Sequence, residues 1–218
     1  MTCPTGKSPT GLGPLPRRHN GLMRIVHTPD KPPAKGMYSL LTASITPRPI
    51  AWISTVSADG VPNLAPYSFF TIACADPAIL SVTSIGHKDT YRNVMETGEF
   101  VVNIGTESLM EIMNATSAPV GPEVDEFAMQ GLTAEPSDVV AAPRVAEAPI
   151  AFECVRHDVI DLGTSAMLLG RVVSVTVEDE VTADDGLPDF GSLLPPSRLG
   201  RRQWGYAPRT RELPRPTQ

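Results

Sequence analysis

The sequence lacks long apolar runs and is poor in cysteine. No stretch of its 218 residues reaches the ~18 consecutive apolar residues of a membrane-spanning helix, and the N-terminal region has no apolar stretch of signal-peptide length. The three cysteines are odd in number and show no metal-ligand spacing: Cys3, Cys74 and Cys154. We therefore expect a cytoplasmic protein with reduced thiols and no membrane contact, in which Cys74 and Cys154 are buried in apolar segments.

Recognisable catalytic and nucleotide-binding motifs are also absent. The sequence contains no HExxH, CxxC, GxSxG, GxGxxG or Walker motif. The histidines are isolated, and even His87, beside Lys88, has no evident orienting partner. Its many carboxylates are scattered and form no acid–base pair. No metal site and no catalytic side chain are predicted, so the chemistry of an enzyme built this way is expected to belong to a cofactor.

Positive charge is scarce in the middle of the chain. Residues 1–36 carry six Lys/Arg and one acidic residue, and residues 186–218 carry six Arg and two acidic residues. The range 37–185 has only six cations against 21 acids. We expect a folded domain over 37–185, a mobile, Pro-rich N-terminal arm over 1–36, and a Pro/Arg-rich C-terminal segment over 186–218 that packs partly on the domain or a partner subunit. An acidic body argues against a nucleic-acid partner.

The central region reads as a series of short strands separated by short helices. Pro62 and Pro66 exclude a helix from the second strand, and Gly60 suits the tight turn before it. No βαβ spacing or internal repeat occurs. The pattern predicts a mainly β fold, a closed or nearly closed barrel with helical insertions. The expected strands cover 49–56, 61–74, 78–85, 99–106, 149–157 and 162–181, and the expected helices cover 90–97, 108–116 and 123–130. Residues 38–46 are compatible with either a strand or a short helix.

The stretch HKDTYRN (87–93) lies between an expected strand and an expected helix. Asp89 or Thr90 would cap the helix, and Lys88 would add a positive charge at a helix end that already attracts anions. One interpretation is ordinary capping with a solvated lysine. The other is a site that holds a phosphate.

Two further segments carry groups suited to an anion. Arg48 lies between two prolines in TPRPIAWIST, and Ser68 lies in the proline-bent segment NLAPYSFF. Each also has an ordinary interpretation, as a surface arginine in a strand-entry turn and as a buried serine with a satisfied hydroxyl. Their occurrence with Lys88 within about 45 residues, on strands expected to be adjacent, favours a shared site.

Taken in order, these segments resemble the flavin reductase-like, FMN-binding split-barrel family, in particular its flavoredoxin branch. The resemblance extends over roughly 38–205, more weakly after 148, and departs from the family pattern at Arg201, Arg202 and Trp204 in RLGRRQWGYA. The motifs that carry it are PRPIAWIST (47–55), VPNLAPYSFF (61–70), ADPAILSVTSI (75–85), HKDTYRN (87–93) and TGEFVVNI (97–104).

The resemblance implies a six-stranded Greek-key split barrel that forms a homodimer, with FMN at or near the subunit interface. It implies that the phosphate and ribityl chain contact Arg48, Ser68, Lys88 and Thr90, and that the isoalloxazine lies along 52–55 and 63–69. The further cofactor-binding candidates are Thr46, Ser54, Asn63 and Phe69.

The same resemblance implies an oxidoreductase that passes a hydride from NAD(P)H to FMN and electrons onward to a monooxygenase or another redox protein. Three alternatives stay open. The protein could be an FMN electron carrier without nicotinamide activity, a non-catalytic split-barrel dimer, or a relative of the pyridoxamine-phosphate oxidases. Met23 is a candidate for the true start of the chain.

Overall fold

A computed structural model describes residues 17–19 and 22–216, so the expectations for residues 1–16 lie outside the described part. The chain divides into two compact units, Met1–Thr46 and Pro47–Gln218. The first unit contains a small hairpin, β1 (Arg17–His19) and β2 (Leu22–Arg24), and helix α1 (Gly36–Ser44). Residues 38–46, for which the sequence allowed a strand or a helix, are therefore mostly helical. Within the described ranges, no helix is long and apolar enough to cross a membrane.

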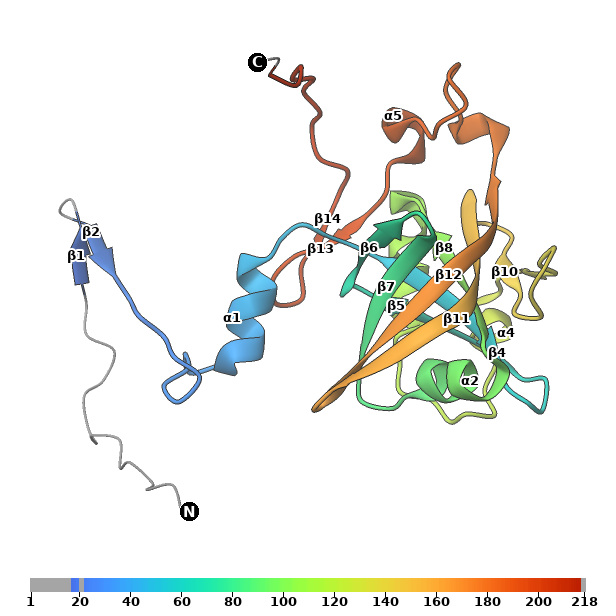
Figure 1. The fold of residues 1–218 in the computed structure, drawn as a ribbon, viewed down its shortest axis with the longest axis horizontal. Helices are drawn as coiled ribbons and strands as arrows, with labels where there is room; N and C mark the ends of the chain where they lie inside the picture. Colours follow the sequence, from blue (N-terminus) through green and yellow to red (C-terminus); the bar gives the residue numbers. More distant parts are fainter. Residues whose placement is uncertain (1–16, 20–21, 217–218) are drawn as a thin grey trace. The chain divides into compact units, whose positions relative to one another are not determined.

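The second unit is built on one antiparallel sheet whose strands follow the order β5-β4-β8-β11-β12-β7-β6 (Figure 1). This confirms the mainly β class, and every expected strand is present, although the strand expected over 149–157 extends to Leu162 and the strand expected over 162–181 covers only Ser165–Val177. The strands are β4 (Ala51–Val56), β5 (Pro62–Tyr67), β6 (Phe70–Ala75), β7 (Ala78–Ile85), β8 (Glu99–Ile104), β11 (Ile150–Leu162) and β12 (Ser165–Val177).

The two edges of this sheet belong to one continuous segment. Only Ser68 and Phe69 separate β5, which pairs with β4 at one edge, from β6, which pairs with β7 at the other. The Phe69 carbonyl accepts a hydrogen bond from the Thr83 N–H at 2.8 Å, which continues the pairing with β7. The sheet therefore curls into a barrel. It has seven hydrogen-bonded strands rather than the expected six, because the bend divides the second arm of the hairpin into two strands.

Short helices and small strands surround the barrel. Gly98, at φ 76°, ends the helix that follows β7, as the sequence predicted. The helical elements are α2 (Asp89–Thr97), η1 (Glu107–Leu109), α3 (Met110–Ala115), α4 (Glu126–Gln130), η2 (Asp179–Val181) and α5 (Phe190–Leu193). The small strands are β9 (Ala134–Glu135) paired with β10 (Arg144–Val145), and β3 (Arg48–Pro49) paired through β13 (Ser197–Arg198) with β14 (Trp204–Gly205).

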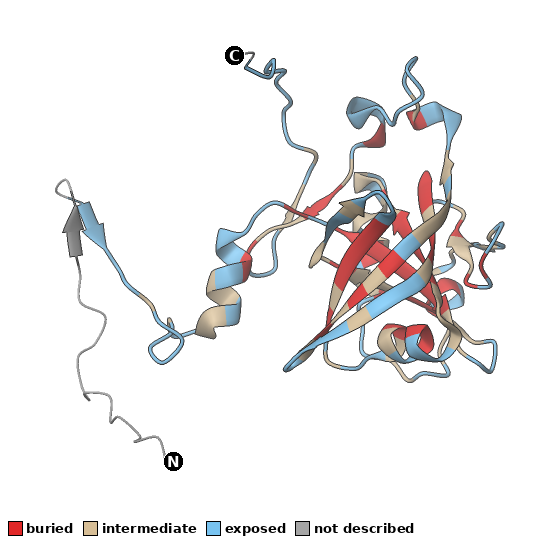
Figure 2. Cartoon of the chain, in the orientation of Figure 1, coloured by how far each residue is buried: buried red, intermediate tan, exposed pale blue. Residues whose placement is uncertain are grey.

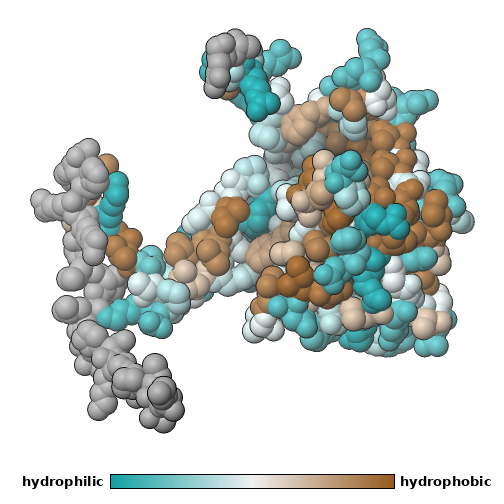
Figure 3. All heavy atoms as spheres, in the orientation of Figure 1, coloured by the Kyte–Doolittle hydropathy of each residue, from teal (hydrophilic) through white to brown (hydrophobic). Residues whose placement is uncertain are grey.

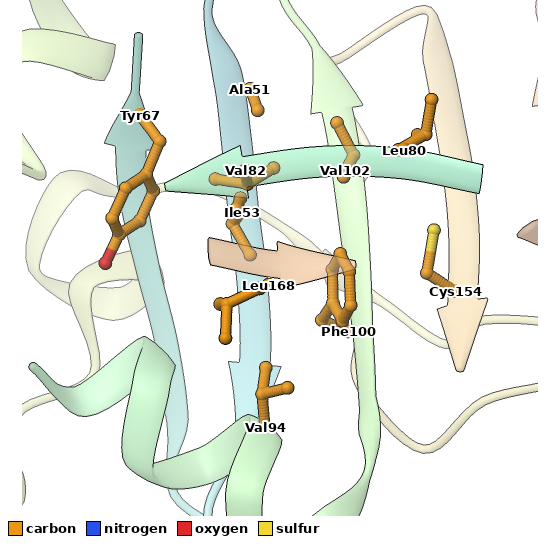
Figure 4. Close-up of a cluster of buried hydrophobic side chains, with 10 residues drawn as sticks. All are labelled: Ala51, Ile53, Tyr67, Leu80, Val82, Val94, Phe100, Val102, Cys154 and Leu168. Atoms are coloured by element: carbon orange, nitrogen blue, oxygen red, sulfur yellow. The ribbon is translucent and has the colours of Figure 1, made fainter. Parts of the chain in front are cut away.

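The barrel encloses a core to which every long strand contributes (Figures 2 and 4). Phe100 lies fully buried against Gly170 of β12, where an added Cβ would overlap the phenyl ring. The glycine at this position therefore permits close packing inside the barrel. Burial of each large apolar side chain contributes roughly 1.5–3 kcal/mol. The core comprises Ala51, Ile53, Tyr67, Leu80, Val82, Val94, Phe100, Val102, Cys154 and Leu168.

The two described cysteines differ in their surroundings. Cys154 is fully buried in the barrel core, as predicted. The prediction of burial is wrong for Cys74, which is only partly covered and whose Sγ lies 3.3 Å from the Asp76 carbonyl. The reason is that β6 is an edge strand of the sheet.

Candidate functional site

A pocket of ≈ 270 Å³ opens where β5 meets the N-terminus of α2. We call it the α2 pocket. Its walls come from β5, from the first turn of α2, from the loop after α3 and from α4. The lining residues are Asn63, Ala65, Pro66, Tyr67, Lys88, Asp89, Thr90, Thr116, Ser117, Ala118, Pro119, Val120 and Glu126.

The first turn of α2 has no side-chain cap. Lys88, in an extended conformation, is the N-cap residue, and its side chain accepts no hydrogen bond from the helix. The sequence suggested that Asp89 would cap the helix. Instead, Asp89 forms an ion pair with Arg92 one turn later. No side chain of the described residues accepts from the N–H groups of this turn. Together with Lys88, which is exposed at the pocket, these N–H groups form a positively polarised end suited to an anion.

A buried network of amides and hydroxyls fixes the wall behind this helix end. Asn63 Nδ2 donates to Thr90 Oγ1 at 3.0 Å and to Thr55 Oγ1 at 3.3 Å. Asn93 Nδ2 also donates to Thr55 Oγ1, at 2.9 Å. Thr90 has no exposed surface, so its hydroxyl acts first as the acceptor for Asn63. The network places both predicted residues, Asn63 and Thr90, at the α2 pocket and holds them rigidly.

Glu126 forms the opposite wall and was not predicted from the sequence. It is buried, and its Oε2 accepts a hydrogen bond from the Leu64 N–H of β5 at 3.0 Å. Burial raises the pKa of Glu126, and the neighbouring carboxylates Asp89 and Asp125 raise it further. In the sequence, Asp125 indicates only the start of a helix. In the structure it caps that helix, because its Oδ1 accepts from the Phe127 N–H. Nothing in the pattern brings Glu126 to β5, because that approach is a tertiary contact.

Tyr67 was not named individually, although it lies in the segment 63–69 expected beside the isoalloxazine and adjoins the predicted Ser68. Its ring is in the barrel core, and its Oη is buried without a hydrogen bond of regular geometry among the described residues (Figure 4). Burial raises the pKa of the Tyr67 phenol, while the nearby Thr90 and Ser84 hydroxyls oppose that shift. Tyr67 therefore links the core to the pocket wall.

A second hollow of ≈ 180 Å³, the Trp204 pocket, adjoins the first and shares Pro66, Tyr67 and Ser117 with it. The Arg198 guanidinium stacks over the Trp204 ring, 5.1 Å from its centroid, and closes one side. The C-terminal segment thus packs on the barrel and supplies part of the site. The remaining lining residues are Ile50, Ser68 and Asn114.

Arg48 and Ser68 contact each other away from Lys88, with Ser68 in the lining of the Trp204 pocket and Arg48 in the lining of a separate hollow beside Pro47 and Pro49. Arg48 Nε donates to Ser68 Oγ at 3.4 Å, and its Nη2 donates to the Leu199 carbonyl at 3.0 Å. Only 8% of Arg48 is exposed, so its guanidinium is turned into the fold and joins β3 to Ser68 and to the C-terminal turn. The structure therefore separates the expected phosphate-binding residues, because Lys88 and Thr90 line the α2 pocket whereas Arg48 is hydrogen-bonded to Ser68 elsewhere.

Besides Arg48, three predicted residues line neither pocket. Ser54 is fully buried, where its Oγ donates to the Pro143 carbonyl at 2.5 Å and accepts from Asn103 Nδ2 at 3.0 Å. Phe69 lies at the bend between β5 and β6, half-buried. Thr46 ends the first compact unit and is not part of the unit that carries both pockets. Of the C-terminal residues singled out above, Trp204 lines a pocket, whereas Arg201 and Arg202 are exposed.

The comparison with known proteins identifies the class to which this fold belongs. Residues 43–192 match the family model described as the flavin reductase-like domain. The chain belongs to the flavin reductase-like family. Its members are flavin-dependent oxidoreductases with a split-barrel fold, which agrees with the barrel and with the two pockets on its surface.

Three solved structures show the extent of the likeness. Nitrilotriacetate monooxygenase component B from Bacillus cereus has 38% sequence identity and a TM-score of 0.83, over 87% of this chain and 98% of that one. The 2-nitrobenzoate 2-nitroreductase NbaA of Pseudomonas fluorescens has 31% identity and a TM-score of 0.77, over 83% and 90%. Flavoredoxin of Desulfovibrio vulgaris has 26% identity and a TM-score of 0.72, over 78% and 91%.

Proposed function

We propose that this flavin reductase-like protein binds FMN across the α2 and Trp204 pockets and reduces it with NAD(P)H. The observation that carries the proposal is the uncapped N-terminus of α2, with Lys88 beside it, at one end of a continuous pair of pockets. Each pocket alone lies below the roughly 300–1,000 Å³ typical of a ligand site, whereas the two together, which share Pro66 and Tyr67, fall within that range. The donors at the helix end fit a phosphate.

Each group of residues has its own role in this proposal. Lys88 and the first N–H groups of α2 hold the phosphate, and Thr90 and Asn63 shape the wall beside it. Arg48 and Ser68 fix the bend between β5 and β6 and the C-terminal turn, against which the rest of the cofactor lies. Thr46, Ser54 and Phe69 stay predictions as cofactor contacts.

Bound FMN would supply hydride acceptance and onward electron transfer, and the chain's own residues would bind and orient it. NAD(P)H as donor is a proposal, supported by membership of a reductase family. A monooxygenase as acceptor is supported by the likeness to a protein titled monooxygenase component B. We propose the cytoplasm as the compartment, because reduced nicotinamide nucleotides are available there.

The test begins with the visible spectrum of the purified protein and a titration with FMN. We expect FMN to bind and its visible absorbance to bleach rapidly on addition of NADH or NADPH. Bound FMN that neither nucleotide bleaches would favour an electron carrier and rule out the reductase. A protein that is colourless and binds no added FMN would rule out both and favour a non-catalytic barrel.

We also propose that the chain forms a homodimer. An apolar hollow of ≈ 610 Å³ opens over β6, β7 and β12, and Figure 3 shows apolar side chains gathered on this face of the barrel. Ile72 in its lining is 71% exposed, and a contiguous exposed apolar surface of this kind is typical of an interface between proteins. Light scattering should report a dimer that Ile72→Glu converts to a monomer. The matched change Ile160→Glu, at an exposed barrel residue outside the hollow, should leave the dimer intact.

A further inference from the structure

Glu126 is an unexpected neighbour for an anion. Its carboxyl lines the α2 pocket together with Lys88 and Thr90, and it is buried with only 5% of the residue exposed. Its Oε2 accepts a hydrogen bond from the Leu64 N–H at 3.0 Å, and this bond holds α4 against β5. That bond needs only an acceptor oxygen, which a carboxylic acid or an amide would also provide. The negative charge of Glu126 is therefore not required by its structural role.

The other titratable groups around Glu126 differ in their surroundings. On α2, Asp89 is paired with Arg92, and Lys88 is exposed at the mouth of the pocket. On α4, Asp125 accepts from the N–H groups of Phe127 and Ala128. On β5, Tyr67 is a buried phenol that stays neutral well above pH 7, since burial raises its pKa. Glu126 is thus a buried pocket carboxyl whose pKa is raised by its burial, and no described cation forms an ion pair with it.

We propose that Glu126 sets the charge that the α2 pocket accepts: when protonated it permits a phosphate beside Lys88, and when ionised it opposes one. This inference rests on the proposed function, because it assumes that the phosphate of FMN occupies this pocket. A dianion beside Glu126 favours the protonated carboxyl, so binding takes up a proton. By the same linkage, affinity for FMN falls as the pH rises through the range in which Glu126 ionises. Riboflavin, which has no phosphate, should not show this loss.

The experiment measures the dissociation constants of FMN and riboflavin, by quenching of flavin fluorescence, for three proteins between pH 5.5 and 8.5. The proteins are the wild type, Glu126→Gln and Glu111→Gln, the last replacing an exposed carboxylate of α3 that lines neither pocket. The second ionisation of the FMN phosphate affects all three equally. We expect the ratio of FMN to riboflavin affinity to fall about tenfold more in the wild type than in Glu126→Gln, which corresponds to a shift of one unit in the Glu126 pKa on binding.

Glu111→Gln should follow the wild type. The same fall in Glu126→Gln as in the wild type would overturn the proposal and leave Glu126 a purely structural residue. If neither flavin binds to the wild type, the proposed function is overturned and this inference with it. That result differs from one in which FMN binds but Glu126→Gln keeps the pH dependence of the wild type, which overturns this inference alone.

A measurement on the wild type covers the case in which Glu126→Gln does not fold. The carboxyl ¹³C shift of Glu126 is followed against pH by NMR, without ligand, with FMN and with riboflavin. We expect FMN, and not riboflavin, to raise the pKa of Glu126. Identical titration curves in the presence of both flavins would contradict the proposal.

Discussion

The amide of Asn63 donates a hydrogen bond to the hydroxyl of Thr90 at 3.0 Å, and this contact joins the proline-containing strand β5 to the first turn of α2. Both residues are buried, so the bond is shielded from competing water. It fixes the distance between two walls of the α2 pocket. The shape of the anion-binding end therefore depends on a contact between residues 27 positions apart in the sequence.

Thr90→Val tests this contact with little change of shape. The valine cannot accept from Asn63, and loss of a buried hydrogen bond should lower the free energy of unfolding by about 1–3 kcal/mol. FMN affinity should fall as well, because the pocket wall loosens. Chemical denaturation and FMN titration measure the two effects. Thr97→Val, which removes a hydroxyl at the far end of the same helix, is the control, and equal losses in both variants would contradict the special role of Thr90.

Lys88→Ala should weaken FMN binding far more than riboflavin binding. A charge-assisted contact to a phosphate contributes about 1.5–3 kcal/mol, and riboflavin has no phosphate to lose it. The ratio of the two dissociation constants, measured by fluorescence quenching, isolates that contribution. Arg171→Ala, which removes an exposed cation of β12 outside both pockets, should leave the ratio unchanged. An equal loss for both flavins in Lys88→Ala would place the phosphate elsewhere.

Arg48→Ala should behave differently from Lys88→Ala. Because Arg48 binds Ser68 and the Leu199 carbonyl within the fold, its loss should loosen the bend after β5 and the C-terminal turn. We expect a lower free energy of unfolding and a similar weakening of FMN and riboflavin. Thermal unfolding and the two titrations check this. A loss confined to FMN would instead show that Arg48 contacts the phosphate, as the family resemblance suggested.

Cys154 should resist alkylation in the native protein. Burial raises the pKa of the Cys154 thiol to about 12, with Glu153 adding to the shift, so almost no thiolate forms near neutral pH. Its contribution to stability should be complete below about pH 8.5, the usual thiol pKa, and lost as the pH rises towards the raised value. Iodoacetamide labelling at pH 8 with peptide mapping should modify Cys154 only in denaturant. Native labelling of Cys154 at the rate seen in denaturant would contradict its burial.

The sequence determined the elements because the signals for them are local. Proline at 62 and 66 excludes a helix, Gly60 and Gly98 adopt the positive φ angles that end a turn and a helix, and β-branched runs form the strands. Ordered motifs along the chain were also enough to indicate the family. These features depend on neighbours within a few residues, and so they can be recognised before any tertiary contact is known.

Only the tertiary structure decided how the site is assembled. The sequence grouped Arg48 with Lys88, but the fold turns Arg48 inward to Ser68 and leaves Lys88 at a separate pocket. The fold also brings Glu126 to β5, where it accepts from the Leu64 N–H, and no local sequence pattern predicts this contact. Side-chain direction, burial and the pKa of a carboxyl depend on what other segments pack around them. Several residues of this site could therefore be predicted from the sequence, whereas their hydrogen-bond partners and protonation depend on how the barrel packs around them.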